Sequence, residues 1–246
     1  MAAILPAILP AILEVEGLTK RFGGFTAVNG LTLSVKPGER FGLIGPNGSG
    51  KTTLINCVSG SLPVDAGRIR FDGRDITHLP AHQRTRLGLV RSFQIPKPFG
   101  SMTLLENLEI PLEYAAARGE DRADADAKEI LKAIGLESKA RLRPAGLTQI
   151  EMRKLELARA MAARPKLLIS DEAMAGLSSA EVDDILAILF RLNEQGITII
   201  MIEHIMRAVM RFSERVVVLD AGERIAEGPP DRIVRDPAVE KAYLGE

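Results

Sequence analysis

The chain of 246 residues has almost no cysteine and no net charge, and these two absences exclude several classes of protein. It has a single cysteine, Cys57, so an intramolecular disulfide is excluded, and we interpret Cys57 as a small buried hydrophobe in a protein of a reducing compartment. Lys plus Arg and Asp plus Glu are equal at 32 each, so no net charge attracts nucleic acid or anionic lipid. We therefore expect partners that are recognised by shape, and no nucleic acid among them.

Apolar runs of membrane-spanning length are also missing, since a helix needs roughly 20 apolar residues to cross a bilayer. The first thirteen residues, MAAILPAILPAIL, are wholly apolar, but two prolines interrupt them. They carry neither the positive start nor the small-residue cleavage site of a signal peptide. We expect a cytosolic chain that can work at a membrane only by docking there.

With 46% hydrophobic and 26% charged residues, the composition is typical of a packed globular protein. Short β-like runs and turns fill residues 13–93, with one helix after Gly50. Residues 96–165 have helical periodicity, and strands and helices alternate again after them. This order predicts an α/β fold with a parallel sheet covered on both faces and a helical insert.

The segment GPNGSGKTT, residues 45–53, fits the phosphate-loop pattern G-x-x-x-x-G-K-[ST] between an apolar run and a helix. Its glycines let the backbone turn its N–H groups inward, and the helix N-terminus adds partial positive charge. We expect Lys51 to neutralise the β and γ phosphates and Thr52 to offer its hydroxyl to Mg²⁺. The candidate nucleotide-binding residues here are Gly45, Pro46, Asn47, Gly48, Ser49, Gly50, Lys51, Thr52 and Thr53.

Two acids follow a second apolar run, KLLIS. Asp171 and Glu172 lie where an acid can reach the metal side of a nucleotide held at the end of a neighbouring strand. Asp171 suits the water shell of a metal ion, and Glu172 suits orienting or deprotonating an attacking water. Because the guanine-reading motif N-K-x-D is missing, a GTPase is disfavoured.

The order of these motifs resembles the ATP-binding subunits of ABC transporters over residues 13–246. The resemblance implies a P-loop NTPase fold, with a RecA-like mixed sheet core, an antiparallel β subdomain and a helical insert. It implies a single ABC ATP-binding domain over 1–246. The α/β core then takes residues 14–94 and 160–246, and the helical subdomain takes residues 95–159.

Further positions follow from the family's motifs. RSFQ ends in Gln94 at the Q-loop position, which implies catalytic and metal-site roles, and IEH supplies His204 as the switch histidine. LTKRFGG offers Phe22 for stacking on adenine, and AGLSS holds the D-loop position. Other interpretations stay open: Phe22 as a core aromatic, Gln94 as a polar residue at a strand end, and His204 as a satisfied core histidine.

The chain departs from the family at the signature LSGGQ, where it has LTQIE, residues 147–151. Without the two glycines, Gln149 and Ile150 crowd the approach to the nucleotide of a partner subunit. Thr148 keeps a hydroxyl for that nucleotide, whereas Glu151 brings a carboxylate near its triphosphate. The segment also forms a capping box, with Thr148 as N-cap and Glu151 at N3, and the same device recurs at Ser178 and Glu181.

From LTQIE we predict two unequal nucleotide sites in a dimer, and slow hydrolysis if the dimer is formed by two copies of this chain. A second departure is Ala173, where the family has proline after the two acids. Loss of the fixed φ there can loosen the loop but leaves the acids in place. A binding-only regulatory subunit is a further alternative, and intact Glu172 and His204 favour retained hydrolysis.

The resemblance implies an ATPase that couples ATP hydrolysis to transport at the cytoplasmic face of a membrane. Its implied partners are a second ABC ATPase subunit, in a homodimer or heterodimer, two membrane permease subunits and, indirectly, a periplasmic or extracellular solute-binding protein.

The RSFQ segment and the ending GERIAEGPPDRIVRDPAVEKAYLGE resemble the branch that takes up branched-chain amino acids, urea and short amides. A similar ending occurs in the ATPases of lipopolysaccharide export, which stays an alternative. A soluble ABC ATPase acting on DNA or ribosomes is disfavoured, because 246 residues leave no room for a second cassette or a long coiled-coil insertion.

Overall fold

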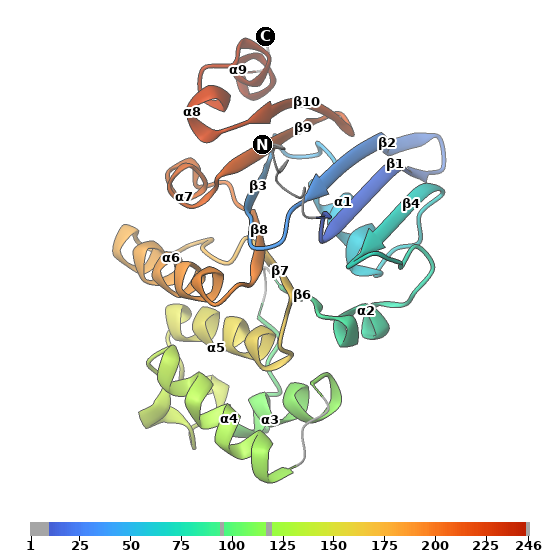
Figure 1. The fold of residues 1–246 in the computed structure, drawn as a ribbon. Helices are drawn as coiled ribbons and strands as arrows, with labels where there is room; N and C mark the ends of the chain where they lie inside the picture. Colours follow the sequence, from blue (N-terminus) through green and yellow to red (C-terminus); the bar gives the residue numbers. More distant parts are fainter. Residues whose placement is uncertain (1–9, 94–95, 117–119, 245–246) are drawn as a thin grey trace, which may run out of the picture.

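The computed structural model describes residues 10–93, 96–116 and 120–244, which form two β-sheets and the helices around them (Figure 1). The first sheet is antiparallel, with strand order β2-β1-β4-β5. Its strands are β1 (Leu13–Phe22), β2 (Phe25–Val35), β4 (Ala66–Phe71) and β5 (Arg74–Asp75). Asp72 and Gly73, with φ of 50° and 74°, make a tight turn between β4 and β5.

The second sheet has six strands in the order β10-β9-β3-β8-β7-β6. Its strands are β3 (Arg40–Ile44), β6 (Leu89–Ser92), β7 (Leu167–Asp171), β8 (Thr198–Ile202), β9 (Arg215–Asp220) and β10 (Glu223–Gly228). All neighbours from β9 to β6 are parallel, and β10 joins β9 as an antiparallel hairpin. The early strand β3 thus lies between two strands from the C-terminal part of the chain, and the mixed α/β fold is confirmed.

The middle of this sheet is buried on both faces. Every residue of β7 and β8 is buried, which is why both contain runs of apolar residues instead of alternating ones. Leu168 packs into one hydrophobic core, whereas Leu167 and Ile169 pack into a second core on the opposite face. The prediction that helices and strands cover both faces of a parallel sheet is therefore correct.

Helix α1 (Lys51–Ser59) follows β3 directly. It ends at Gly60, whose φ of 80° lets its N–H reach two carbonyl groups of the last turn. The buried apolar side chains of this helix are Leu54, Ile55, Cys57 and Val58. Both the helix after Gly50 and the burial of Cys57 confirm the sequence prediction.

The described residues between β6 and β7 form a group of helices that lies at the end of the molecule away from the antiparallel sheet (Figure 1). It contains α3 (Leu104–Tyr114), α4 (Glu120–Ala133), η1 (Glu137–Lys139), η2 (Pro144–Gly146) and α5 (Gln149–Ala162), whereas α2 (Ala81–Leu87) precedes β6. Helix α4 buries Ala123, Ala127 and Leu131, while its Asp124 and Lys128 form an exposed ion pair at 2.6 Å. Helix α4 is thus amphipathic, with a buried apolar face and an exposed charged face.

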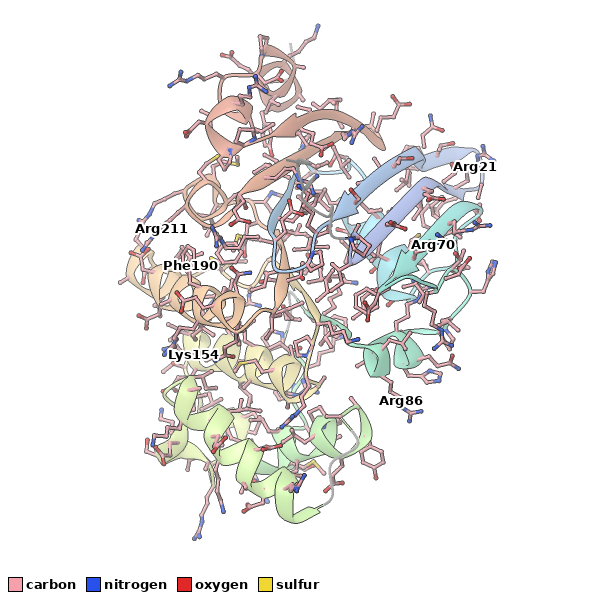
Figure 2. The ribbon with its side chains drawn as sticks, in the orientation of Figure 1. Arg21, Arg70, Arg86, Lys154, Phe190 and Arg211 are labelled. Carbon is pink, nitrogen blue, oxygen red and sulfur yellow. The ribbon has the colours of Figure 1, made fainter. Side chains whose placement is uncertain are left out.

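The remaining helices are α6 (Ser179–Glu194), α7 (Met206–Phe212), α8 (Pro230–Ile233) and α9 (Pro237–Leu244). Figure 2 labels two of the side chains that join α6 to its neighbours. Lys154 of α5 pairs with Asp184 at 3.2 Å, and Arg211 of α7 pairs with Asp183 at 2.6 Å. Across the described ranges, no helix combines the length and the apolar composition that crossing a membrane requires.

Candidate nucleotide site

The phosphate loop connects β3 to α1, so it lies at the carboxyl end of a central parallel strand. Gly45 and Gly50 have φ of 150° and 100°, a region that favours glycine. A Cβ on Gly45 would lie 2.1 Å from the carbonyl oxygen of Leu219, and a Cβ on Gly50 would lie 2.4 Å from that of Ala27. These two glycines are therefore required by the close approach of neighbouring backbone.

The side chain of Lys51 is hydrogen-bonded to the phosphate loop that precedes it. Its Nζ donates to the carbonyl oxygens of Gly45 and Pro46 at 2.7 and 2.9 Å and to Ser49 Oγ at 3.4 Å. Burial lowers the pKa of Lys51, and the negative charges of Glu172 and Asp171 oppose this effect. A buried ammonium group at a helix N-terminus can bind the oxygens of a phosphate group in place of these carbonyls.

A cavity of about 280 Å³ opens beside the loop. It is lined by residues 47–53 together with Phe22, Phe25, Ala27, Glu172 and His204. The structure therefore brings together the predicted aromatic residue, most of the phosphate loop, one of the two acids and the histidine. Gly45, Pro46, Thr148 and Asp171 are not among the residues that line it, and Gln94 lies outside the residues that the structure describes.

Sequence reasoning missed two residues that line the cavity, Phe25 and Ala27, and Phe25 is the aromatic one. Phe22 and Phe25 face each other across the β1-β2 hairpin, in which Gly23 and Gly24 form the two-residue connection. Their side chains are 48% and 63% exposed, so both rings leave apolar surface beside the phosphate loop. The signal was available, because F-G-G-F is typical of a tight hairpin that places its two flanking residues side by side.

Glu172 and His204 meet at the ends of two neighbouring strands, β7 and β8. His204 Nε2 and Glu172 Oε1 are 2.9 Å apart. Glu172 has a φ of 47°, and its backbone N–H donates to the carbonyl oxygen of Ile202 at 2.9 Å. A non-glycine residue in this conformation is strained, and such strain is frequent at catalytic sites. Glu172 is thus a carboxylate in contact with a histidine, an arrangement that can orient water and accept its proton.

Asp171 is buried at the end of β7. It is 6% exposed, and Arg91 of β6 donates to its Oδ2 from Nη2 at 2.6 Å. The prediction that its strand neighbours the strand of the phosphate loop is wrong, because β8 lies between β7 and β3. Two strand spacings, about 10 Å, separate the two strands. An intervening strand cannot be counted from sequence, since it enters the sheet from later in the chain.

The donor set fits a Mg²⁺ ion held mainly by phosphate and water. Among the described residues, no group of three His, Cys, Asp or Glu side chains could form a protein cage for a metal ion. The hydroxyl of Thr52 is in the exposed first turn of α1, and Asp171 supplies a carboxylate. Mg²⁺ is typically bound by one or two protein oxygens together with phosphate oxygens and water.

The segment LTQIE begins α5 with the predicted capping box. Thr148 accepts from the backbone N–H of Glu151, whose carboxylate accepts from the backbone N–H of Thr148 at 3.0 Å. Lys139 Nζ also donates to both carboxylate oxygens of Glu151, at 2.6 and 2.8 Å. The hydrogen bonds from Lys139 and Thr148 lower the pKa of Glu151. The second predicted capping box, Ser178 with Glu181, is also present.

Comparison with known proteins identifies the class that this fold and this site define. The family model described as "ABC transporter" matches residues 28–175, and the chain belongs to that family. It is an ATP-binding cassette, a nucleotide-binding ATPase of the ABC class. A second model, described as "Branched-chain amino acid ATP-binding cassette transporter", matches residues 223–246.

Individual relatives agree with this assignment. The high-affinity branched-chain amino acid transport ATP-binding protein BraF of Pseudomonas aeruginosa is 41% identical, over 96% of this chain and 98% of its own length. The probable branched-chain amino acid transport ATP-binding protein LivG of Archaeoglobus fulgidus is 37% identical, over 95% of each chain.

Solved structures share the fold. The ADP conformation of the ATP-binding cassette MJ1267 has a TM-score of 0.88 and 34% identity, covering 96% of this chain and all of that one. A dimeric post-hydrolysis state of the ATP-binding cassette MJ0796, bound to ADP and Pi, has a TM-score of 0.79 and 28% identity. It covers 89% of this chain and 98% of that one.

Proposed function

We propose that the chain is the ATP-binding and hydrolysing subunit of an ABC importer for branched-chain or other hydrophobic amino acids. The observation that carries the ATPase part is the single cavity in which Lys51, Glu172 and His204 meet beside two exposed phenylalanines. The substrate class is supported by the relative of 41% identity and by the match of residues 223–246.

Each group of the cavity has a proposed role. Phe22 and Phe25 stack on the adenine ring, the N–H groups of residues 45–53 bind the phosphates, and Lys51 neutralises them. Glu172 accepts the proton of the attacking water, and His204 keeps Glu172 in place and contacts the γ-phosphate. Thr52, Asp171 and Gln94 would hold Mg²⁺, which supplies charge neutralisation on the phosphates when it is bound.

We propose that two such cassettes close around ATP, because a nucleotide that contacts both subunits favours the closed state. The dimeric state of the related cassette MJ0796 supports this arrangement. Residues 95–159 would form the helical subdomain that carries LTQIE. In a dimer Thr148 would reach the nucleotide of the partner subunit, less well than a glycine-rich signature would, so the two sites would be unequal. Two permease subunits and an external solute-binding protein would complete the importer at the cytoplasmic face of a membrane.

Reconstitution tests this proposal. The full chain is expressed with the permease, receptor and ATPase genes that accompany it, and the complex is purified and placed in proteoliposomes. We expect ATP-dependent uptake of labelled leucine, and its loss when Lys51→Ala replaces the wild-type chain. Uptake of urea or short amides but not leucine, or extraction of lipopolysaccharide, would contradict the proposed substrate class. Uptake that persists with Lys51→Ala would contradict the proposed role of this chain.

A further inference from the structure

Arg91 makes an internal ion pair that the proposed catalytic roles leave unexplained. Its Nε and Nη2 donate to Oδ2 of Asp171 at 3.2 and 2.6 Å. Its Nη1 donates to Oδ1 of Asn56 at 2.6 Å. The side chains of Arg91 and Asp171 are 10% and 8% exposed, so the pair is largely shielded from water. One guanidinium group thus ties β6 to the end of β7 and to α1, the helix that begins in the phosphate loop.

Within the described part of the chain, the side-chain hydrogen bonds to Asp171 leave its Oδ1 open. Among the described residues, each side-chain hydrogen bond to Asp171 ends on Oδ2. Two donors on a single oxygen fix the rotation of the carboxylate, and Asn56 fixes the guanidinium in turn. The guanidinium also lies 5.4 Å from the centre of the Phe93 ring. Oδ1 is therefore presented in a constant direction while Oδ2 is held by the protein.

Two physical effects of Arg91 on a metal ion oppose each other. Its positive charge repels a cation, so by charge alone its removal would strengthen Mg²⁺ binding. Its planar fork holds Asp171 at a fixed place relative to α1, so by geometry its removal would weaken Mg²⁺ binding. The donors of Arg91 reach acceptors on two separate elements, which a lysine ammonium cannot reproduce with the same fixed angles.

We propose that Arg91 is a positioning residue of the metal site, which fixes Asp171 against α1 so that Oδ1 can bind a water molecule of Mg²⁺. This inference rests on the proposed function, because it takes Asp171 as the acid of a Mg·ATP site. It assigns a role to a side chain three residues before the Q-loop position, on the strand that leads into it. Arg91 is not among the residues that line the nucleotide cavity, so its effect acts through the orientation of Asp171.

The test measures binding of a fluorescent ATP analogue to the purified full chain while Mg²⁺ is titrated, with a parallel measurement in EDTA. We expect Arg91→Lys and Arg91→Met both to raise the half-saturating Mg²⁺ concentration by about tenfold, the range seen when the support of a metal ligand is removed. Binding in EDTA should stay at the wild-type level, since the phosphate loop is intact. Asn56→Ala should shift the Mg²⁺ dependence in the same direction, to a smaller extent.

A matched control separates positioning from general stability. Arg215 is another part-buried arginine, and it lies on β9, in the same sheet as β6 and β7. Its Nε is 2.7 Å from Oε1 of Glu39. Arg215→Lys should lower stability without moving the Mg²⁺ titration. The proposal is overturned if Arg91→Lys titrates like the wild type, or if Arg91→Met binds Mg²⁺ more tightly. If the Arg91 variants do not fold, Asn56→Ala decides the question. The proposal is then overturned if the Mg²⁺ titration of this variant is the same as that of the wild type. A wild-type chain without any Mg²⁺ dependence would instead overturn the metal site of the proposed function.

Discussion

Glu203 is a buried carboxyl group whose ionisation should make the stability of the protein depend on pH. The residue is 2% exposed, and its Oε1 accepts a hydrogen bond from the backbone N–H of Met174 at 2.9 Å. Burial raises the pKa of Glu203 from 4.5 to about 7, and the negative charge of Glu172 adds to the rise. The backbone N–H groups of Met174 and His204 and the charge of Arg153 act in the opposite direction.

The sign of the effect follows from which state holds the proton. Well below pH 4.5 the carboxyl group of Glu203 is protonated in both the folded and the unfolded chain, so it does not make the free energy of unfolding depend on pH. As the pH rises from 4.5 to about 7, the unfolded chain loses the proton while the folded chain keeps it, so stability falls. Above pH 7 the loss is complete. The difference between the two pKa values, 4.5 and about 7, corresponds to a loss of about 3 kcal/mol in the free energy of unfolding, at about 1.4 kcal/mol for each pKa unit.

The variant Glu203→Gln removes this dependence while it keeps a neutral oxygen that can accept from Met174. At pH 5 we expect the variant to be more stable than the wild type by only about 1 kcal/mol, because the unfolded wild-type chain has already lost most of the proton of Glu203 there while the folded chain keeps it. At pH 8 we expect the variant to be more stable by about 3 kcal/mol, since its folded state no longer buries a charge. Urea unfolding followed by circular dichroism at several pH values between 5 and 8 measures the difference.

A second glutamate provides the control. The hydroxyl and backbone N–H of Ser178 lower the pKa of Glu181 at the start of α6. Glu181→Gln should therefore destabilise the protein by the same amount throughout pH 5–8, because this carboxylate is charged in both states over that range. The reasoning about Glu203 is refuted if Glu203→Gln is less stable than the wild type at pH 8, or if its difference from the wild type does not grow with pH.

Three further predictions concern the nucleotide. Glu172→Gln should lower ATP turnover at least 100-fold and trap an ATP-bound dimer, seen by size-exclusion chromatography; unchanged turnover would exclude Glu172 as the base. Phe25→Ala should weaken binding of ATP about tenfold but leave tripolyphosphate binding unchanged, because only adenine stacks on the ring; equal losses for both ligands would count against stacking. Gln149→Gly should raise the ATPase rate of the isolated chain more than Glu151→Gln does, and the reverse order would show that charge limits hydrolysis.

Local patterns in the sequence predicted the parts of the site that depend on neighbouring residues. The glycine spacing of residues 45–53 predicted the loop between β3 and α1, and the structure shows why Gly45 and Gly50 are needed there. The capping boxes at Thr148 and Ser178 were equally local, because donor and acceptor lie three residues apart. Each of these patterns lies within a few consecutive residues, so it can be recognised in the sequence before the fold is known.

Contacts between distant residues could not be predicted in the same way. Arg91 and Asp171 are 80 positions apart, and their ion pair exists because β6 and β7 are neighbours in the sheet. The position of β8 between β3 and β7 is likewise a property of the sheet order. Sequence reasoning therefore placed Asp171 at the end of a strand correctly, but it could not place that strand relative to the phosphate loop.

The segment LTQIE shows how such distant contacts change a functional argument. From sequence, the carboxylate of Glu151 counts against binding a triphosphate, but Lys139 compensates its charge within the same chain. The obstacle that we still expect is steric, because Gln149 brings a side chain to a position where the family has glycine. Gln149 Nε2 lies 3.4 Å from the carbonyl oxygen of Ala175 and 2.6 Å from the place of a Cβ on Gly176, so this side chain packs against residues 175–176 of its own chain. Because a glycine there would free the backbone N–H groups for a partner's nucleotide, the missing glycine should limit hydrolysis more than the added charge does.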